Sequence, residues 1–243
     1  MRSSKLITKT QKTVSSDFTS RNHELLIKAG YINQEMAGVY SFLPLGLIVL
    51  KKIENIVREE MNLLDGQELI LPALQPKQNW LQTKRWDNFD VLFRLKSRWS
   101  ESEYALGPTH EETIFPLVRK FVSSYKDLPL SVYQFQTKFR DEKRAKSGVL
   151  RGREFGMKDM YSFHETEEDL SAYYEKVKQG YINIFEKCGI NPKVTKASGG
   201  GFTEKHSHEF MAISSAGEDL IINCPKCYYA ENVEVSSLKE GDS

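Results

Sequence analysis

Apolar residues recur at helical spacing in the stretch that follows Pro44. Proline suits the first turn of a helix, so the pattern predicts a helix that begins at Pro44 and ends near Gly66. Residues 67–73 then have the pattern of a strand that ends near Pro72. The apolar stripe of the predicted helix consists of Leu45, Ile48, Val49, Ile53, Ile56, Val57 and Met61.

Two further helices are predicted from their first turns. Thr109 is expected to cap the second helix, with Glu112 completing a capping box, and Pro116 should kink that helix or end its first segment. Thr166 is expected to cap the third helix, whose first turn is acidic and which should end at Gly189.

Residues 131–140 alternate between apolar and polar side chains, which predicts a strand. Residues 141–150 form a loop and residues 151–163 a returning strand, on which Arg151 and Phe155 would share a face. Shorter strands are predicted at 194–197, 209–213 and 220–223, around a Gly-rich turn at 199–201. Long helices beside hairpin-connected strands predict an α+β domain with an antiparallel sheet flanked by helices.

Composition narrows the class of protein. The chain has 243 residues, 40% of them hydrophobic, and a formal net charge of +1. No apolar run reaches the roughly 20 residues that span a bilayer, so we expect no membrane segment. The near-neutral charge argues against a generally basic nucleic-acid coat. Residues 1–16 contain basic but no acidic side chains, which fits a solvated arm in a cytoplasmic protein or a transit peptide to the mitochondrial matrix.

Positive charge is concentrated between residues 140 and 153, where six basic side chains face two acidic ones. Such a field attracts phosphate. Arg140 could hold a phosphate or carboxylate by two hydrogen bonds, Glu142 could accept from an exocyclic amine, and Arg151 with Phe155 could add a second clamp and a stacking ring. Spacing alone also fits an exposed hairpin with one core phenylalanine. The basic residues are Arg140, Lys143, Arg144, Lys146, Arg151 and Arg153.

Other polar groups give weaker signals. Cys224 and Cys227 have the spacing of half a zinc site, but only one other cysteine, Cys188, is present, so zinc binding stays open. Three cysteines do not make a disulfide framework, and a reducing compartment fits better. His208 is a lone histidine, a residue that is more often structural than catalytic.

Several motifs in order resemble the class II aminoacyl-tRNA synthetases, and within them the bacterial-type prolyl enzymes. The run Gln-Thr-Lys-Phe-Arg-Asp-Glu at 136–142, with Arg-Gly-Arg-Glu-Phe at 151–155, resembles motif 2. Residues 38–46, the helix to Met61 and the strand to Pro72 resemble the motif 1 region. Gly-Pro-Thr-His-Glu-Glu at 107–112 resembles the proline-recognition loop, and Ser-His-Glu-Phe at 207–210 is also similar to the family.

The resemblance implies that proline is activated with ATP and Mg²⁺ to prolyl-adenylate and then transferred to its tRNA. Arg140 would bridge the proline carboxylate and the α-phosphate, and Thr109 and Glu111 would bind the proline ammonium. The remaining implied contacts are His208 in the proline pocket, Glu142 on the adenine amine, Phe155 against the adenine ring, Arg151 on the γ-phosphate, and Lys143, Arg144 and Lys146 near tRNA.

The resemblance also implies an organisation. Residues 1–220 would form the catalytic core, and residues 221–243 would begin a linker, an insertion or a zinc-ribbon-like segment. The motif 1 region would form a homodimer interface. The Ala-Lys-Ser-Gly sequence at 145–148 departs from the commonest form of the motif 2 loop.

No counterpart of motif 3 or of an anticodon-binding domain is recognised in the sequence. We therefore expect this chain by itself to be nearly inactive, as the N-terminal portion of a synthetase. A non-catalytic synthetase-like protein that binds nucleotide, RNA or a partner synthetase is the alternative, and a class II enzyme for another amino acid is a third reading.

Overall fold

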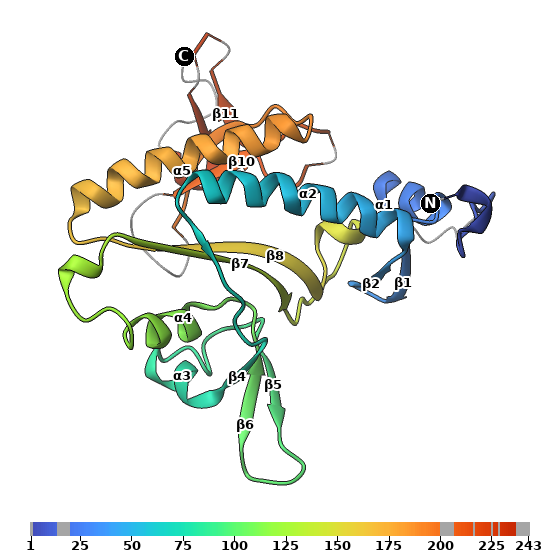
Figure 1. The fold of residues 1–243 in the computed structure, drawn as a ribbon. Helices are drawn as coiled ribbons and strands as arrows, with labels where there is room; N and C mark the ends of the chain where they lie inside the picture. Colours follow the sequence, from blue (N-terminus) through green and yellow to red (C-terminus); the bar gives the residue numbers. More distant parts are fainter. Residues whose placement is uncertain are drawn as a thin grey trace. The chain divides into compact units, whose positions relative to one another are not determined.

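The computed structural model describes residues 2–13, 20–199, 207–215, 217–224, 226–227 and 229–236. The chain divides into two compact units, Met1–Leu170 and Ser171–Ser243. Both units combine helices with mixed sheets, which confirms the α+β fold class (Figure 1). The proposed boundary at residue 220 stays a prediction.

The first unit is built around the long antiparallel pair β7 (Leu130–Phe139) and β8 (Glu154–Phe163), which Figure 1 shows as two curved neighbouring strands. The short strand β3 (Gln67–Glu68) pairs with β7 in parallel. A second sheet has the order β4 (Leu74–Pro76), β6 (Glu103–Leu106), β5 (Phe93–Lys96), and a separate hairpin joins β1 (Ile32–Met36) to β2 (Val39–Phe42).

Four α-helices lie within this unit, among the residues that the structure describes. They are α1 (Arg21–Lys28), α2 (Pro44–Leu63), α3 (Lys77–Gln82) and α4 (Glu111–Val118). Pro44 occupies the first turn of α2 as predicted, and the Gly66 amide bonds to the Met61 carbonyl just beyond the helix end at 3.0 Å. The single strand predicted at 67–73 is wrong in extent, because only Gln67–Glu68 pairs with β7 before the chain leaves for the second sheet.

The hydrophobic core beside the β7–β8 pair joins α4 to one face of the strands. Ile114 and Val118 of α4 pack with Val132 of β7 and with Leu71, while Tyr161 and Phe163 of β8 pack against this cluster. A second cluster gathers Trp80, Trp86, Leu92 and Ala105 under the smaller sheet. These clusters fix α4, and therefore the loop before it, against β7.

The second unit has a four-stranded sheet whose order is β10 (Ser207–Met211), β9 (Lys193–Ala197), β12 (Ala230–Asn232), β11 (Ile221–Asn223). Helix α5 (Glu167–Lys187) begins at the end of the first unit and continues into the second; Thr166 caps it, and Gly189 follows it at φ +77°, both as predicted. Tyr181 and Phe185 of α5 lie against Phe210 of β10. Strand β12 was not predicted. Part of the Gly-rich turn, from residue 200, lies outside the described residues.

Short 3₁₀ turns complete the chain at Ser3–Lys5, Tyr125–Asp127, Gly148–Leu150 and Val233–Val235. Among the described residues, no helix combines the length and apolar content that a membrane crossing requires.

Candidate active site

Arg140 follows β7 directly and lies over the ring of Phe155 on β8. Its guanidinium carbon is 5.3 Å from the ring centroid, and its backbone amide bonds to the Arg153 carbonyl at 2.8 Å. One terminal nitrogen donates a long bond of 3.4 Å to the Pro108 carbonyl, while the buried Nε has no acceptor among the described residues. A guanidinium with donors to spare is suited to binding an anion beside the ring.

Thr109 and Glu111 are held next to Arg140 by the loop that precedes α4. The Phe139 amide bonds to the Gly107 carbonyl at 3.1 Å, and the Gln75 side chain donates to the Thr109 carbonyl at 2.9 Å. The Thr109 hydroxyl donates to the Glu111 carboxylate. The Glu111 carboxylate, on the first residue of α4, therefore lies three residues from Pro108, which contacts Arg140. The two charges could bind the two ends of an amino acid.

The predicted capping box on α4 is wrong. The N-cap residue is His110, whose side chain makes no capping bond. Thr109 instead bonds to Glu111, while Glu112 turns into the protein, is 2% exposed, and accepts from Arg85 at 2.7 Å and from Thr83 at 3.2 Å. Pro116 is accommodated within α4, which ends two residues later.

Glu142 and Arg151 form an ion pair at 3.4 Å rather than two separate contact points. Arg151 is about half exposed, and β8 begins only at Glu154, so the predicted strand from residue 151 is wrong at its start. Before β8, Arg151 pairs with Lys146 of the loop, and the backbone amide of Arg153 donates to the Gly38 carbonyl at 2.7 Å rather than to β7.

Arg153, one of the basic residues between 140 and 153, supports the site in a way that the sequence did not predict. Its side chain donates to the Glu142 carbonyl at 2.9 and 3.1 Å and to the Ala37 carbonyl at 2.9 Å. Gly38 has φ +79°, and a Cβ there would lie 2.6 Å from the Ala145 Cβ. The β1–β2 hairpin thus supports the base of the loop between β7 and β8. In the sequence, this support is indicated by Gly38, a residue type that tolerates a positive φ.

A second set of residues missed by the sequence lies under the amino-acid loop. Lys138 is fully buried, and its Nζ is 2.8 Å from Asp159 Oδ1 and in contact with His110 Nδ1. Burial lowers the pKa of Lys138, and burial followed by the Lys138 charge lowers the pKa of His110 to about 4. In the sequence, Gln134, Gln136 and Lys138 alternate with apolar residues and so share one face of the strand with Arg140.

The predicted tRNA contacts Lys143, Arg144 and Lys146 are all exposed on the loop between β7 and β8. The Ser147 carbonyl accepts from Asn22 of α1 at 3.4 Å, and Gly148 packs against His23. Helix α1 therefore supports the far side of the loop, on which the three basic side chains are exposed.

His208 belongs to the second unit, where it lies on β10 with its Nδ1 3.0 Å from the Tyr174 hydroxyl. Burial lowers the pKa of His208. Its role in a proline pocket stays a prediction.

Cys224 and Cys227 lie after β11 as free thiols. A hydrogen bond from the Lys226 backbone is the main cause that lowers the pKa of Cys224, with Cys227 adding to it. Within the described parts of the chain, no group of three potential metal ligands forms.

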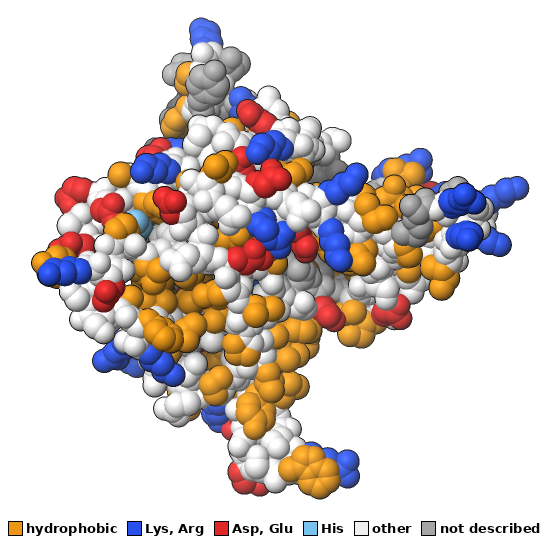
Figure 2. Space-filling model, in the orientation of Figure 1, with side chains coloured by type: hydrophobic (Ala, Val, Ile, Leu, Met, Phe, Trp, Pro, Cys, Tyr) orange, Lys and Arg blue, Asp and Glu red, His pale blue; other side chains and the backbone are white. Residues whose placement is uncertain are grey.

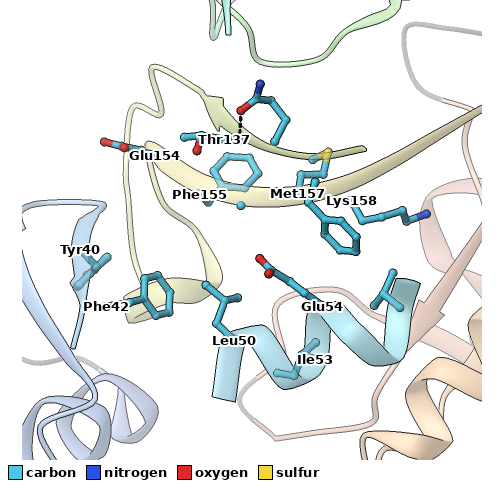
Figure 3. A pocket seen from close by; sticks show the side chains of 14 residues that line it. Tyr40, Phe42, Leu50, Ile53, Glu54, Thr137, Glu154, Phe155, Met157 and Lys158 are labelled. Atoms are coloured by element: carbon cyan, nitrogen blue, oxygen red, sulfur yellow. Dashed lines mark hydrogen bonds between the residues drawn. The ribbon is translucent and has the colours of Figure 1, made fainter. Parts of the chain in front are cut away.

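A cavity of about 400 Å³ lies on the other side of β7–β8, between the strands, β2 and α2 (Figure 3). Leu50, Ile53 and Glu54 of α2 face the strands there, with Tyr40 and Phe42 at one end. Arg140, Thr109 and Glu111 do not line this cavity, whereas Phe155, the ring beside Arg140, does.

The arrangement of Arg140, Phe155 and the Thr109–Glu111 segment agrees with the family that the chain matches. Residues 93–243 match the family model "tRNA synthetase class II core domain (G, H, P, S and T)", and the chain belongs to this family. Solved prolyl-tRNA synthetases share the fold: the enzyme from Giardia lamblia in complex with prolyl-adenylate has a TM-score of 0.70 at 21% identity over 77% of this chain and 40% of that one. The Cryptosporidium parvum enzyme complexed with halofuginone and AMPPNP has a TM-score of 0.69 at 20% identity, covering 77% of this chain and 39% of that one.

Within the family, the similar curated proteins are proline–tRNA ligases. Those of Moorella thermoacetica and Geobacillus kaustophilus are 46% and 49% identical over 98% of this chain, and that of Bacillus subtilis is 47% identical over the same share. The chain spans 42% of the length of each of these relatives.

Proposed function

We propose that this chain supplies the amino-acid-binding and nucleotide-binding residues of a proline–tRNA ligase. The observation that carries the proposal is Arg140, which has a buried, unsatisfied donor, an aromatic ring beside it, and the Thr109–Glu111 loop in contact through Pro108. Similarity to proline–tRNA ligases over 98% of the chain supports the choice of proline.

In the proposed first step, a carboxylate oxygen of proline attacks the α-phosphorus of ATP. The bond from that phosphorus to the oxygen bridging to the β-phosphate breaks, and pyrophosphate leaves with the electron pair. Arg140 would neutralise both anions as they approach, so its contribution is positioning and charge stabilisation. Mg²⁺ would accompany ATP on its phosphate oxygens.

The proline ammonium would be bound by the Glu111 carboxylate, which the Thr109 hydroxyl orients by a hydrogen bond. A charged ammonium taken from water needs such a partner. Phe155 would stack on adenine, while Glu142 would accept from its amine and Arg151 would bind the γ-phosphate. Those last two roles require the Glu142–Arg151 pair to open when ATP binds.

Calorimetric binding of a non-hydrolysable sulfamoyl analogue of prolyl-adenylate tests the proposal on the chain itself. Wild-type chain should bind the analogue. Arg140→Ala should bind it about 100-fold more weakly, because charged hydrogen bonds contribute about 1.5–3 kcal/mol each. The control is Arg119→Ala, which removes an exposed arginine at the end of α4 and should bind like wild type. Equal binding by Arg140→Ala and wild type would contradict the role of Arg140.

Pyrophosphate exchange distinguishes a non-catalytic binding protein from a portion of a ligase. Proline-dependent exchange of pyrophosphate into ATP should be close to background for residues 1–243, and it should appear in a longer form that contains the remaining synthetase motifs. Exchange that depends on serine or threonine instead would favour an enzyme for another amino acid.

The wider assembly belongs to the same proposal. The exposed side chains of Ile48 and Val49 on α2 support a homodimer through the motif 1 region, which sedimentation at several protein concentrations would test. Exposed Lys143, Arg144 and Lys146 support contact with tRNA, whose affinity should fall as salt rises. Similarity to bacterial ligases supports a cytoplasmic location.

A further inference from the structure

Contacts at both ring nitrogens of His110 select one of its two neutral tautomers. A lysine ammonium can only donate, so His110 Nδ1 accepts from Nζ. His110 Nε2 is 3.1 Å from the Pro72 carbonyl, which can only accept, so Nε2 carries the proton. The imidazole is therefore fixed at both nitrogens, between β7 and the chain that leads into β4.

The same lysine is connected to the amino-acid loop through Asp159. Oδ1 of Asp159 pairs with Lys138 at 2.8 Å, and Oδ2 accepts from Gln134 at 2.9 Å and from Tyr161 at 2.6 Å. Burial and then the charge of Glu111 raise the pKa of Tyr161, while a hydrogen bond with Thr109 acts in the opposite direction. Thr109 and Glu111, which flank His110 in sequence, therefore lie close enough to Tyr161 to affect its ionisation.

The buried ion pair between Lys138 and Asp159 is not explained by a contribution to the free energy of unfolding. Replacing buried ion pairs with apolar residues is often neutral or stabilising, whereas removing one partner is strongly destabilising. The charges of Lys138 and Asp159 also cancel, which leaves the Glu111 carboxylate as the local charge for a substrate ammonium.

We propose that Lys138, Asp159 and His110 form a buried positioning network that holds Thr109 and Glu111 in the geometry for binding the proline ammonium. The inference rests on the proposed function and names positioning residues, because none of the three contacts the substrate. It predicts that the network affects recognition of the amino acid and leaves recognition of the nucleotide alone.

Lys138→Met and Lys138→Met/Asp159→Asn test the network by calorimetry with two probes, AMP and the sulfamoyl analogue of prolyl-adenylate. Both variants should bind the analogue at least 10-fold more weakly than wild type and bind AMP within 2-fold of wild type. The double variant removes both charges, so its melting temperature should return close to wild type while its weak analogue binding persists. Lys158→Met is the matched control, since Lys158 lies on β8 one residue from Asp159 and so on the opposite face.

A titration of His110 by NMR gives a readout that does not depend on binding. The charges that face His110 are Lys138 from β7 and Asp159 from β8, beside the Pro72 carbonyl. In Lys138→Met the ammonium is lost and Asp159 is unbalanced, so the His110 resonance should titrate at least 1 pH unit higher than in wild type.

The outcomes separate the two proposals. Failure of wild-type chain to bind either probe would contradict the proposed function. Normal binding of the analogue by the double variant, or an unchanged His110 titration in Lys138→Met, would overturn the network while leaving the proposed function intact.

Discussion

The two faces of the β7–β8 pair are equally enclosed at their centres but differ in chemistry. On one face, Tyr133 and Phe135 lie toward α2, with Arg58 of that helix 4.6 Å from the Phe135 ring centroid. On the other face, Gln134, Lys138 and Asp159 form a polar network beside the α4 core. Tyr133, Gln134 and Lys138 all have 0% exposure.

The difference in polar contacts indicates that the two faces have different roles. The α2 face has a cavity and few polar contacts, so its side chains mainly hold the helix on the strands. The α4 face connects Gln134, Lys138 and Asp159 through buried polar contacts and ends at Arg140 with an unsatisfied donor. Polar groups that are buried and paired cost conformational freedom and desolvation, and they are expected where geometry must be fixed.

The largest expected effect is on the α2 face. Tyr133→Ala should lower the free energy of unfolding by about 3–5 kcal/mol, because a large buried side chain is removed. Urea unfolding measures this change. The matched variant Tyr133→Phe loses only the hydroxyl that donates to Asn62 at 2.7 Å, and the loss should be about 1–2 kcal/mol. Altered AMP affinity in the stably folded Tyr133→Phe would contradict a purely structural role for this face.

On the α4 face, Glu111→Gln should weaken binding of the prolyl-adenylate analogue by about 10–100-fold, equivalent to about 1.5–3 kcal/mol for a charged hydrogen bond. AMP, which has no ammonium, should bind as it does to wild type. Parallel titrations with the two ligands check the prediction. An equal loss for both ligands would show that Glu111 acts on the nucleotide or on the fold.

Acid should destabilise the first unit through the α4 face. The pKa of His110 is lowered to about 4 in the folded protein, while an unfolded histidine titrates near 6.5. Between these values the unfolded chain binds more protons, so stability is full above about pH 6.5 and falls as the pH drops toward 4. The loss between pH 7.5 and 5 should be about 2 kcal/mol.

Urea unfolding at several pH values measures that slope. His23 and His208 also have lowered pKa values because of burial, so they contribute in the same direction. The difference between wild type and His110→Gln isolates His110. If the two proteins lose stability in parallel from pH 7.5 to 5, folding does not lower the pKa of His110, and the prediction is wrong.

The smallest effect should come from the solvent edge of the α2 face. Arg58→Met removes an ion pair with Glu68 at 2.8 Å and a contact with the Phe135 ring. Both groups of the pair are about one-third exposed, so the change in the free energy of unfolding should be about 0.5–1 kcal/mol. Thermal unfolding in low and high salt checks it, because screening should remove part of the difference between the proteins.

Hydrophobic exposure is uneven within the first unit. Figure 2 shows orange side chains gathered around α4 and the segment between β3 and β4. Exposed residues there include Ile70 between the two strands, Leu74 at the start of β4 and Phe115 of α4. The α4 face is therefore polar where it carries the site and apolar at the neighbouring surface.

Local patterns in the sequence predicted the elements that short-range physics controls. Proline at the start of α2, the Thr166 cap on α5 and the alternation along β7 each depend on residues within a few positions of one another, and all three were confirmed. The extent of β3 and the start of β8 were not, because β-pairing depends on partners far along the chain, such as Gly38 for Arg153.

By itself, the sequence determined the α+β class, the helical and strand periods, and the motifs that point to Arg140, Thr109 and Glu111. Only the tertiary structure decided that His110 rather than Thr109 occupies the N-cap position of α4, that Glu142 pairs with Arg151, and that Lys138 is buried against Asp159 and His110. Alternation shows which residues share a face, whereas burial and the choice among competing hydrogen-bond partners depend on what packs over that face.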